Sequence, residues 1–183
     1  MTEILRKGNR SYTVWQSMLQ RCYSKSYLAR KPTYKDCTVS SNFKNFEYFH
    51  DWCSRQVGFN TKDHVGISFA LDKDILVRGN KQYSEDTCCF VPQEINNLFT
   101  GNNMNNVLPR GVYRNVRGKP FRVRIYVDGK RKGLGSFNTV EEAFLVYKQA
   151  KEERIMYFAN KWKDQIDPKV YTALTTWDVR ITD

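Results

Sequence analysis

The sequence predicts an α+β protein. Its N-terminal part is expected to hold helices and a strand–strand–helix finger, and its C-terminal part a three-stranded antiparallel sheet packed on one helix. Three observations predict this class. Large apolar side chains recur at helical spacing between residues 12 and 53, a strand–loop–strand–helix pattern occupies 65–99, and strict alternation marks a strand at 121–127. No stretch of about 18 apolar residues occurs, so no membrane span is predicted.

The N-terminal part is expected to form a helical core. Four apolar side chains recur at i, i+3, i+4 and i+7, on one face of a helix over 12–27: Trp15, Met18, Leu19 and Cys22. A loop and a short strand follow in 30–40. Ser40 or Ser41 then caps a second helix, whose apolar side chains are mostly aromatic: Phe43, Phe46, Phe49, Trp52 and Cys53. Aromatic side chains of this size and number predict burial.

Residues 65–99 predict a finger of two strands and a helix. A strand at 67–72, a long loop and a strand at 88–91 precede a helix, in which Pro92 takes a first-turn position that needs no N–H donor. The following residues, 100–109, are rich in Asn and have no apolar period, which is typical of a linker. We therefore expect one domain at 1–100 and a second at 108–160, joined by a linker at 101–107.

The second domain is expected to contain a sheet with one apolar and one basic face. Two sets of side chains alternate along 121–127: Phe121, Val123, Ile125 and Val127 on one side, and Arg122, Arg124 and Tyr126 on the other. Asp128-Gly129 is a preferred two-residue hairpin turn, and a further strand runs through Arg131 to Phe137.

A helix and a C-terminal segment follow this sheet. Thr139 and Glu142 predict a capping box for a helix that reaches about Asn160. The segment 161–183, with a short helix at 168–175, is expected to dock on the long helix, because that helix carries more apolar residues than one sheet face can cover. The docking side chains would be Trp162, Leu174 and Trp177.

The positive charge is concentrated in the second domain. The chain has a formal net charge of +11, and residues 101–160 hold 12 basic and 5 acidic side chains. Between residues 110 and 132, nine Lys or Arg stand against one acid, Asp128. Arginine offers a planar fork to phosphates and to the acceptor edge of guanine. A basic surface can serve solubility alone, but the restriction to one strand face favours nucleic-acid binding.

Residues 108–160 resemble the AP2 domain, a DNA-binding module of three strands and a helix known from plant transcription factors and from phage and homing-endonuclease proteins. The resemblance lies in Arg110-Gly-Val, in Leu134-Gly-Ser-Phe137, in the Thr-x-Glu-Glu-Ala helix start and in Tyr147. It implies that the sheet lies in the major groove of double-stranded DNA. The expected DNA-binding residues are Arg110, Tyr113, Asn115, Arg117, Arg122, Arg124, Tyr126 and Arg131, with Gly133 at a further contact position.

Residues 65–99 resemble the ββα-metal finger of HNH endonucleases. Three segments fall in the slots of that family's motif: Leu71-Asp72-Lys73, Gly79-Asn80-Lys81 and Phe90-Val91 with Asn96. The resemblance implies that Asp72 and Asn96 would bind Mg²⁺ in an active finger, and it places Lys73 where the family has its catalytic histidine. Together with the AP2-like module, nearly the whole chain resembles phage-encoded HNH endonuclease-like proteins.

The exchange of histidine for lysine bears on catalysis. A histidine with a pKa near neutrality can deprotonate water, whereas a lysine amine ordinarily titrates at about 10.4. The carboxylates of Asp72 and Asp74 also favour a charged ammonium at Lys73. His50 and His64 lie outside the motif, and His64 would approach it only if the loop at 60–66 folds back.

Three functions stay open at this point. The first is a duplex-DNA-binding protein whose nuclease finger has decayed, and the second is an active Mg²⁺-dependent HNH-type homing or nicking endonuclease. The third is a phage inhibitor or adaptor that binds a host protein through the aromatic C-terminal segment. Five cysteines without a CxxC pair and only two histidines argue against a structural zinc site and favour a reducing cytoplasm.

Overall fold

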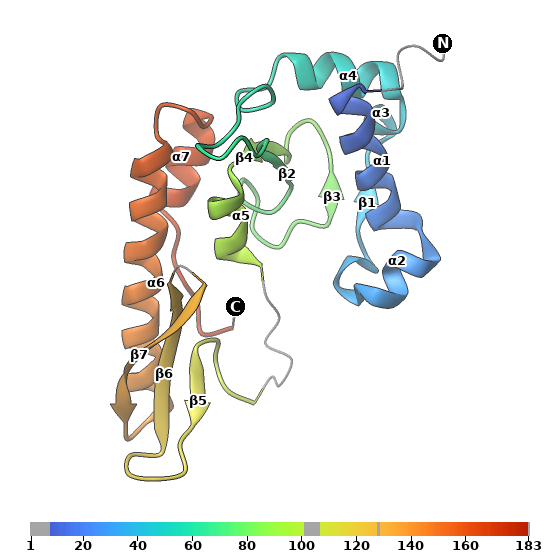
Figure 1. Ribbon diagram of the computed structural model, residues 1–183. Coiled ribbons are helices and arrows are strands. Elements are labelled where there is room, and N and C mark those ends of the chain that lie inside the picture. Colours follow the sequence, from blue (N-terminus) through green and yellow to red (C-terminus); the bar gives the residue numbers. More distant parts are fainter. Residues whose placement is uncertain (1–7, 101–106, 128, 183) are drawn as a thin grey trace. The chain divides into compact units, whose positions relative to one another are not determined.

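The computed structural model describes residues 8–100, 107–127 and 129–182, and it has the predicted mixed α+β architecture (Figure 1). Two compact units divide the chain. The first comprises Met1–Asn96 and Trp162–Ala173, and the second comprises Asn97–Lys161 and Leu174–Asp183. Most of the expected linker (residues 101–106) and Asp128 of the expected turn lie outside the described residues.

The first unit consists of short helices and two small two-stranded sheets. In chain order it contains α1 (Arg10–Tyr23), α2 (Lys25–Arg30), a 3-10 helix (Pro32–Tyr34), β1 (Thr38–Val39), α3 (Ser41–Lys44), α4 (Phe46–Ser54), β2 (Ala70–Asp72), β3 (Gln82–Tyr83), β4 (Cys89–Val91) and α5 (Gln93–Phe99), which continues into the second unit. β1 and β3 pair in parallel, whereas β2 and β4 are antiparallel. β2, β4 and α5 thus follow one another as expected for a ββα finger.

Each of the two long helices predicted near the N-terminus is divided in two. Ser24 separates α1 from α2, because its backbone is extended and its hydroxyl accepts a hydrogen bond from the N–H of Tyr27. Asn45 separates α3 from α4 in the same way, through the N–H of Tyr48. The predictions of single helices here are therefore corrected. In both cases an N-capping side chain starts a new helix in place of continuing the old one.

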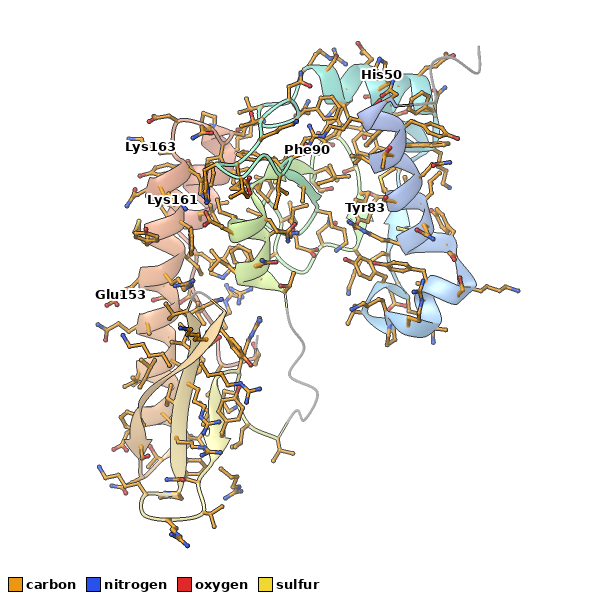
Figure 2. The ribbon with its side chains drawn as sticks, in the orientation of Figure 1. His50, Tyr83, Phe90, Glu153, Lys161 and Lys163 are labelled. Carbon is orange, nitrogen blue, oxygen red and sulfur yellow. The ribbon has the colours of Figure 1, made fainter. Side chains whose placement is uncertain are left out.

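The predicted aromatic core of the first unit is confirmed. Phe43, Phe49 and Cys53 are fully buried, and Tyr83 and Phe90, both labelled in Figure 2, are nearly so. Trp162, at the end of the long helix, also belongs to this core. Its ring meets that of Phe69 edge-on at 5.5 Å between centroids, and its Nε1–H donates to Glu94 Oε2 at 2.8 Å.

The second unit contains the expected three-stranded antiparallel sheet. Its elements are β5 (Val112–Arg114), β6 (Phe121–Val127), β7 (Lys130–Phe137) and α6 (Val140–Trp162), and α7 (Pro168–Thr175) is divided between the units. The strand order is β5-β6-β7. Val127 pairs with Lys130, so two residues connect these strands, and Gly129 has a φ of +76°. This matches the hairpin expected from Asp128-Gly129.

α6 begins with the predicted capping box and runs beside the sheet (Figure 1). Glu142 donates its N–H to Thr139 Oγ1 at 3.1 Å, and its carboxylate accepts the N–H of Thr139 at 3.4 Å. The Tyr147 ring of α6 is buried and lies directly against Gly111, which precedes β5. This contact requires a residue without Cβ at position 111 and places β5 on the helix.

The C-terminal residues of the second unit pack against α6. Lys148 on α6 bonds to Glu152 Oε1 at 2.6 Å, to the Asp178 carboxylate and to the carbonyl oxygen of Val179 at 3.0 Å. Trp177 stacks on Phe99 with 4.5 Å between ring centroids. Of the helices that the structure describes, none has an apolar stretch long enough to span a bilayer.

Candidate nucleic-acid interface

One face of the sheet gathers five of the predicted DNA-binding side chains. Tyr113 on β5 is directly opposite Arg122 on β6, and Tyr126 on β6 is opposite Arg131 on β7. Directly paired residues share a face, as do residues two apart on one strand, so Arg124 lies between these two pairs. We call these five residues, Tyr113, Arg122, Arg124, Tyr126 and Arg131, the basic face.

The opposite face of the sheet is apolar and buried, as the alternation predicted. Val112, Val123 and Ile125 are between 1% and 7% exposed, whereas Tyr113 and Tyr126 on the basic face are 42% and 54% exposed. A bulge between Val123 and Arg124 shifts the register of β6 against β7. The burial of one face therefore sets which side chains of the strands meet solvent.

Two arginines of the basic face lie over tyrosine rings. The guanidinium carbon of Arg124 is 5.9 Å from the ring centroid of Tyr113, and that of Arg131 is 5.4 Å from the centroid of Tyr126. Arg131 also donates its Nε–H to the hydroxyl oxygen of Tyr126. This hydrogen bond is the main cause that raises the pKa of Arg131 above its ordinary value. Both rings thus restrict the orientation of a positively charged fork.

Arg122, the third arginine of the basic face, keeps one donor without a partner. Its Nε is a buried atom and makes no hydrogen bond. An unsatisfied buried donor carries a free-energy cost of about 1–3 kcal/mol.

The remaining predicted contact residues lie off the basic face. Arg110 donates to the carbonyl oxygen of Thr100. Asn115 closes the turn between β5 and β6, because its Nδ2 donates to the carbonyl oxygens of Arg117 at 2.8 Å and of Lys119 at 3.1 Å. Arg117 is exposed on that turn. The sheet therefore brings five of the eight predicted residues together, and the turn and the start of β5 hold the other three.

Arg110 is one of three cations near the middle of α6. Lys151 donates to the carbonyl oxygen of Leu98 at 2.5 Å. Burial lowers the pKa of Lys151 to about 8, and the charges of Arg110 and Arg154 act in the same direction. This cluster was not predicted from the sequence, because the spacing of its members along the chain has no regular period.

In the finger, the Asp72 carboxylate accepts hydrogen bonds from the backbone of the loop that follows β2. The residue is 9% exposed, and its Oδ1 accepts the N–H of Asp74 at 2.7 Å and the N–H of Ile75 at 2.9 Å. Burial raises the pKa of Asp72, and these two hydrogen bonds oppose that effect. A short carboxylate that accepts N–H bonds two and three residues on is a common turn-forming arrangement.

Lys73 is also held by the loop. It is 5% exposed, and its Nζ donates to Asp74 Oδ1 at 2.5 Å and to the carbonyl oxygen of Asn80 at 2.9 Å. Asn80 in turn donates its Nδ2 to the carbonyl oxygen of Lys73 at 2.8 Å and to that of Gln82 at 2.6 Å. Sequence reasoning noted Asn80 only as part of a motif. In the structure, this side chain joins both ends of the loop.

The other candidate catalytic groups, Asn96, His50 and His64, lie on other elements of the first unit. Asn96 lies within α5, and its backbone N–H donates to the carbonyl oxygen of Pro92. His50 is on α4, where its Nδ1 is 2.7 Å from the buried Ser11 hydroxyl (Figure 2). His64 is exposed on a turn closed by Asp63 Oδ1, which accepts two backbone N–H groups.

The finger residues do not fit a Mg²⁺ centre. Mg²⁺ retains several water ligands and binds carboxylates that are accessible beside them. Asp72 is buried with Oδ1 already bonded twice, and the carboxylate of Asp74 pairs with Lys73. Within the described ranges, no group of three or more His, Cys, Asp or Glu side chains is placed to hold a metal ion. In this arrangement the carboxylate of Asp72 holds the loop after β2.

The aromatic residues considered as partner-binding anchors pack inside the units. Trp162 and Leu174 are 4% and 2% exposed. The Trp177 ring contacts that of Phe99 at an angle of 51°. The five cysteines are buried and free, as expected for Cys22 and Cys53.

Comparison of the chain with protein-family models, with curated proteins and with solved structures found no match.

Proposed function

We propose that this protein binds double-stranded DNA through the basic face, with the sheet in the major groove. The observation that carries the proposal is the meeting of three arginines and two exposed tyrosines on one side of a sheet whose other side is buried. Arginine forks suit phosphate oxygens and the O6/N7 edge of guanine. The major groove of B-form DNA admits a two-stranded β-ribbon, and β6 and β7 form an antiparallel pair of this kind.

The spacing of the arginines along β6 supports this ligand. Residues two apart on a strand are separated by about 6.6–6.8 Å. Two base-pair steps of B-form DNA rise by about 6.8 Å. Arg122 and Arg124 can therefore address positions two base pairs apart while the strand follows the groove.

We assign a structural role to the finger in this proposal. The side chains of Asp72, Lys73 and Asn80 bond to the backbone of the loop, and Lys73 also bonds to the Asp74 carboxylate, so all three have structural partners. A protein that retains the ββα arrangement with these internal bonds would gain stability from it, and DNA binding would rest on the second unit.

A salt titration of DNA binding tests the proposal. If the sheet neutralises about 5–8 phosphates, the logarithm of the binding constant should fall against the logarithm of the salt concentration with a slope of about −4.5 to −7. A bidentate arginine contact is worth about 1–3 kcal/mol, so the Arg124→Ala/Arg131→Ala double variant should bind at least about tenfold more weakly.

A matched double variant controls for the loss of charge. Lys25→Ala/Lys35→Ala also removes two positive charges, but from exposed positions of the first unit. Fluorescence anisotropy with a labelled duplex should show near wild-type affinity for this variant. Equal affinities of the two double variants would refute the assignment of binding to the basic face.

A further inference from the structure

The tyrosines of the basic face have a function distinct from that of its arginines. We infer that Tyr126 is a positioning residue, which orients the Arg131 fork before DNA binds and so determines how strongly Arg131 selects its base. This inference rests on the proposed function and adds a specificity-determining residue to it. Tyr113 has the same relation to Arg124, in a weaker form.

In the Tyr126–Arg131 pair, the tyrosine occupies one edge of the guanidinium and leaves the other edge available. Tyr126 and Arg131 are cross-strand partners next to the two-residue connection of β6 and β7, where the backbone spacing is fixed. The Nε–H of Arg131 is used by the Tyr126 hydroxyl, while the cation lies over the ring at 5.4 Å. The edge formed by the two terminal nitrogens stays available, and this edge can bond to O6 and N7 of guanine together.

Pre-orientation matters because arginine is long and mobile. Ordering such a side chain at an interface lowers affinity by about two- to tenfold, a cost that is reduced when the free protein already holds the bound conformation. Both residues are exposed, so packing in the core does not impose their arrangement. The hydroxyl bond and the ring contact are what restrict Arg131.

The second pair provides an internal comparison. Arg124 lies over Tyr113 at 5.9 Å, close to the limit for a cation–π contact. The Tyr126–Arg131 pair adds a hydrogen bond from the guanidinium to the tyrosine hydroxyl, whereas the Tyr113–Arg124 pair is described by its ring contact. Removal of the Tyr126 hydroxyl should therefore weaken binding by more than removal of the Tyr113 hydroxyl.

A double-mutant cycle on full-length protein tests this inference. A duplex is first selected from a randomised library with the wild type, and anisotropy then measures Tyr126→Phe, Arg131→Ala and the double variant on it. Tyr126→Phe keeps the ring and should weaken binding about three- to tenfold. In the Arg131→Ala background the same change should have no further effect. Tyr157→Phe is the matched control, because Tyr157 is an exposed tyrosine of α6 outside the basic face, and this variant should stay within about twofold of the wild type.

Two outcomes would overturn the inference. An unchanged affinity of Tyr126→Phe would show that the hydroxyl bond does not matter, and an equal loss in the Arg131→Ala background would show that Tyr126 contacts DNA itself. The free protein gives an independent readout. In NMR spectra, the Arg131 Nε–H should exchange slowly with solvent in the wild type and rapidly in Tyr126→Phe. If the wild type binds no duplex at all, the proposed function fails, which is a different result from a failed cycle.

Discussion

Replacement of Gly111 by alanine should destabilise the second unit more than replacement of Gly118, a turn glycine of the same unit. Gly111 has a φ of +81°, and a Cβ at this position would lie 2.0 Å from Cδ2 and 2.3 Å from Cε2 of the Tyr147 ring. Its carbonyl oxygen also accepts the N–H of Arg124 at 3.0 Å. The residue thus joins α6 to the strand that carries the basic face.

The expected magnitude has two parts. A non-glycine residue in the left-handed region costs about 1–2 kcal/mol. Displacement of a buried ring by an inserted methyl group costs about 1–3 kcal/mol more, because the ring must move or leave its rotamer. Together they predict a loss of about 2–5 kcal/mol in the free energy of unfolding, a large part of the stability of a small domain.

Gly118→Ala is the matched control. Gly118 has a φ of +75° in the turn between β5 and β6, and a Cβ there would meet nothing within 4 Å. This variant should therefore lose only the first part, about 1–2 kcal/mol. Urea denaturation followed by circular dichroism compares the two variants. Equal midpoints would refute the reasoning, since they would show that the Tyr147 ring imposes no cost.

Two further predictions concern the finger and the buried lysine. Supercoiled plasmid incubated with Mg²⁺ should stay intact with the wild type and with Lys73→His, because Asp72 already bonds to the loop backbone. Metal-dependent nicking that is lost in Asp72→Ala would contradict this prediction. The pKa of Lys151 is lowered to about 8, so between about pH 8 and 10.4 the unfolded chain binds more protons than the folded one, and stability should rise with pH. In thermal melts, the melting temperature of the wild type relative to that of Lys151→Met should rise with pH across this window. A difference that stays constant with pH would show that folding does not lower the pKa of Lys151.

The elements that the sequence predicted well are those encoded by neighbouring residues. The alternation of β6, the two-residue connection and the capping box of Thr139 and Glu142 each depend on residues within a few positions of one another. Burial of the apolar side chains of β6, such as Val123 and Ile125, then leaves the alternate side chains on the solvent-exposed face. The alternation therefore placed Arg122, Arg124 and Tyr126 on one face, whereas Tyr113 and Arg131 were expected as DNA contacts only from the AP2 resemblance.

Other features depend on tertiary structure and were missed. The parallel pairing of β1 with β3 involves two residues on each strand, too few for a periodic pattern. The division of α1 from α2 depended on whether Ser24 caps a new helix or continues the old one, and propensity does not decide this. The bonds of Lys73 involve the carbonyl oxygen of Asn80, whose direction follows from the path of the whole loop.

The way the chain is divided limits how its parts can be inherited or recombined. It passes between the two units within α5, within α6 and again within α7, so the first unit is assembled from two separate stretches of sequence. Ile166 and Val170, which are 3% and 0% exposed, belong to the first unit although they follow the sheet in the sequence. A gene fusion joined near residue 100 would deprive the first unit of these side chains. Transfer of this sheet to another protein would thus require an internal insertion between residues 97 and 161 and not an end-to-end fusion.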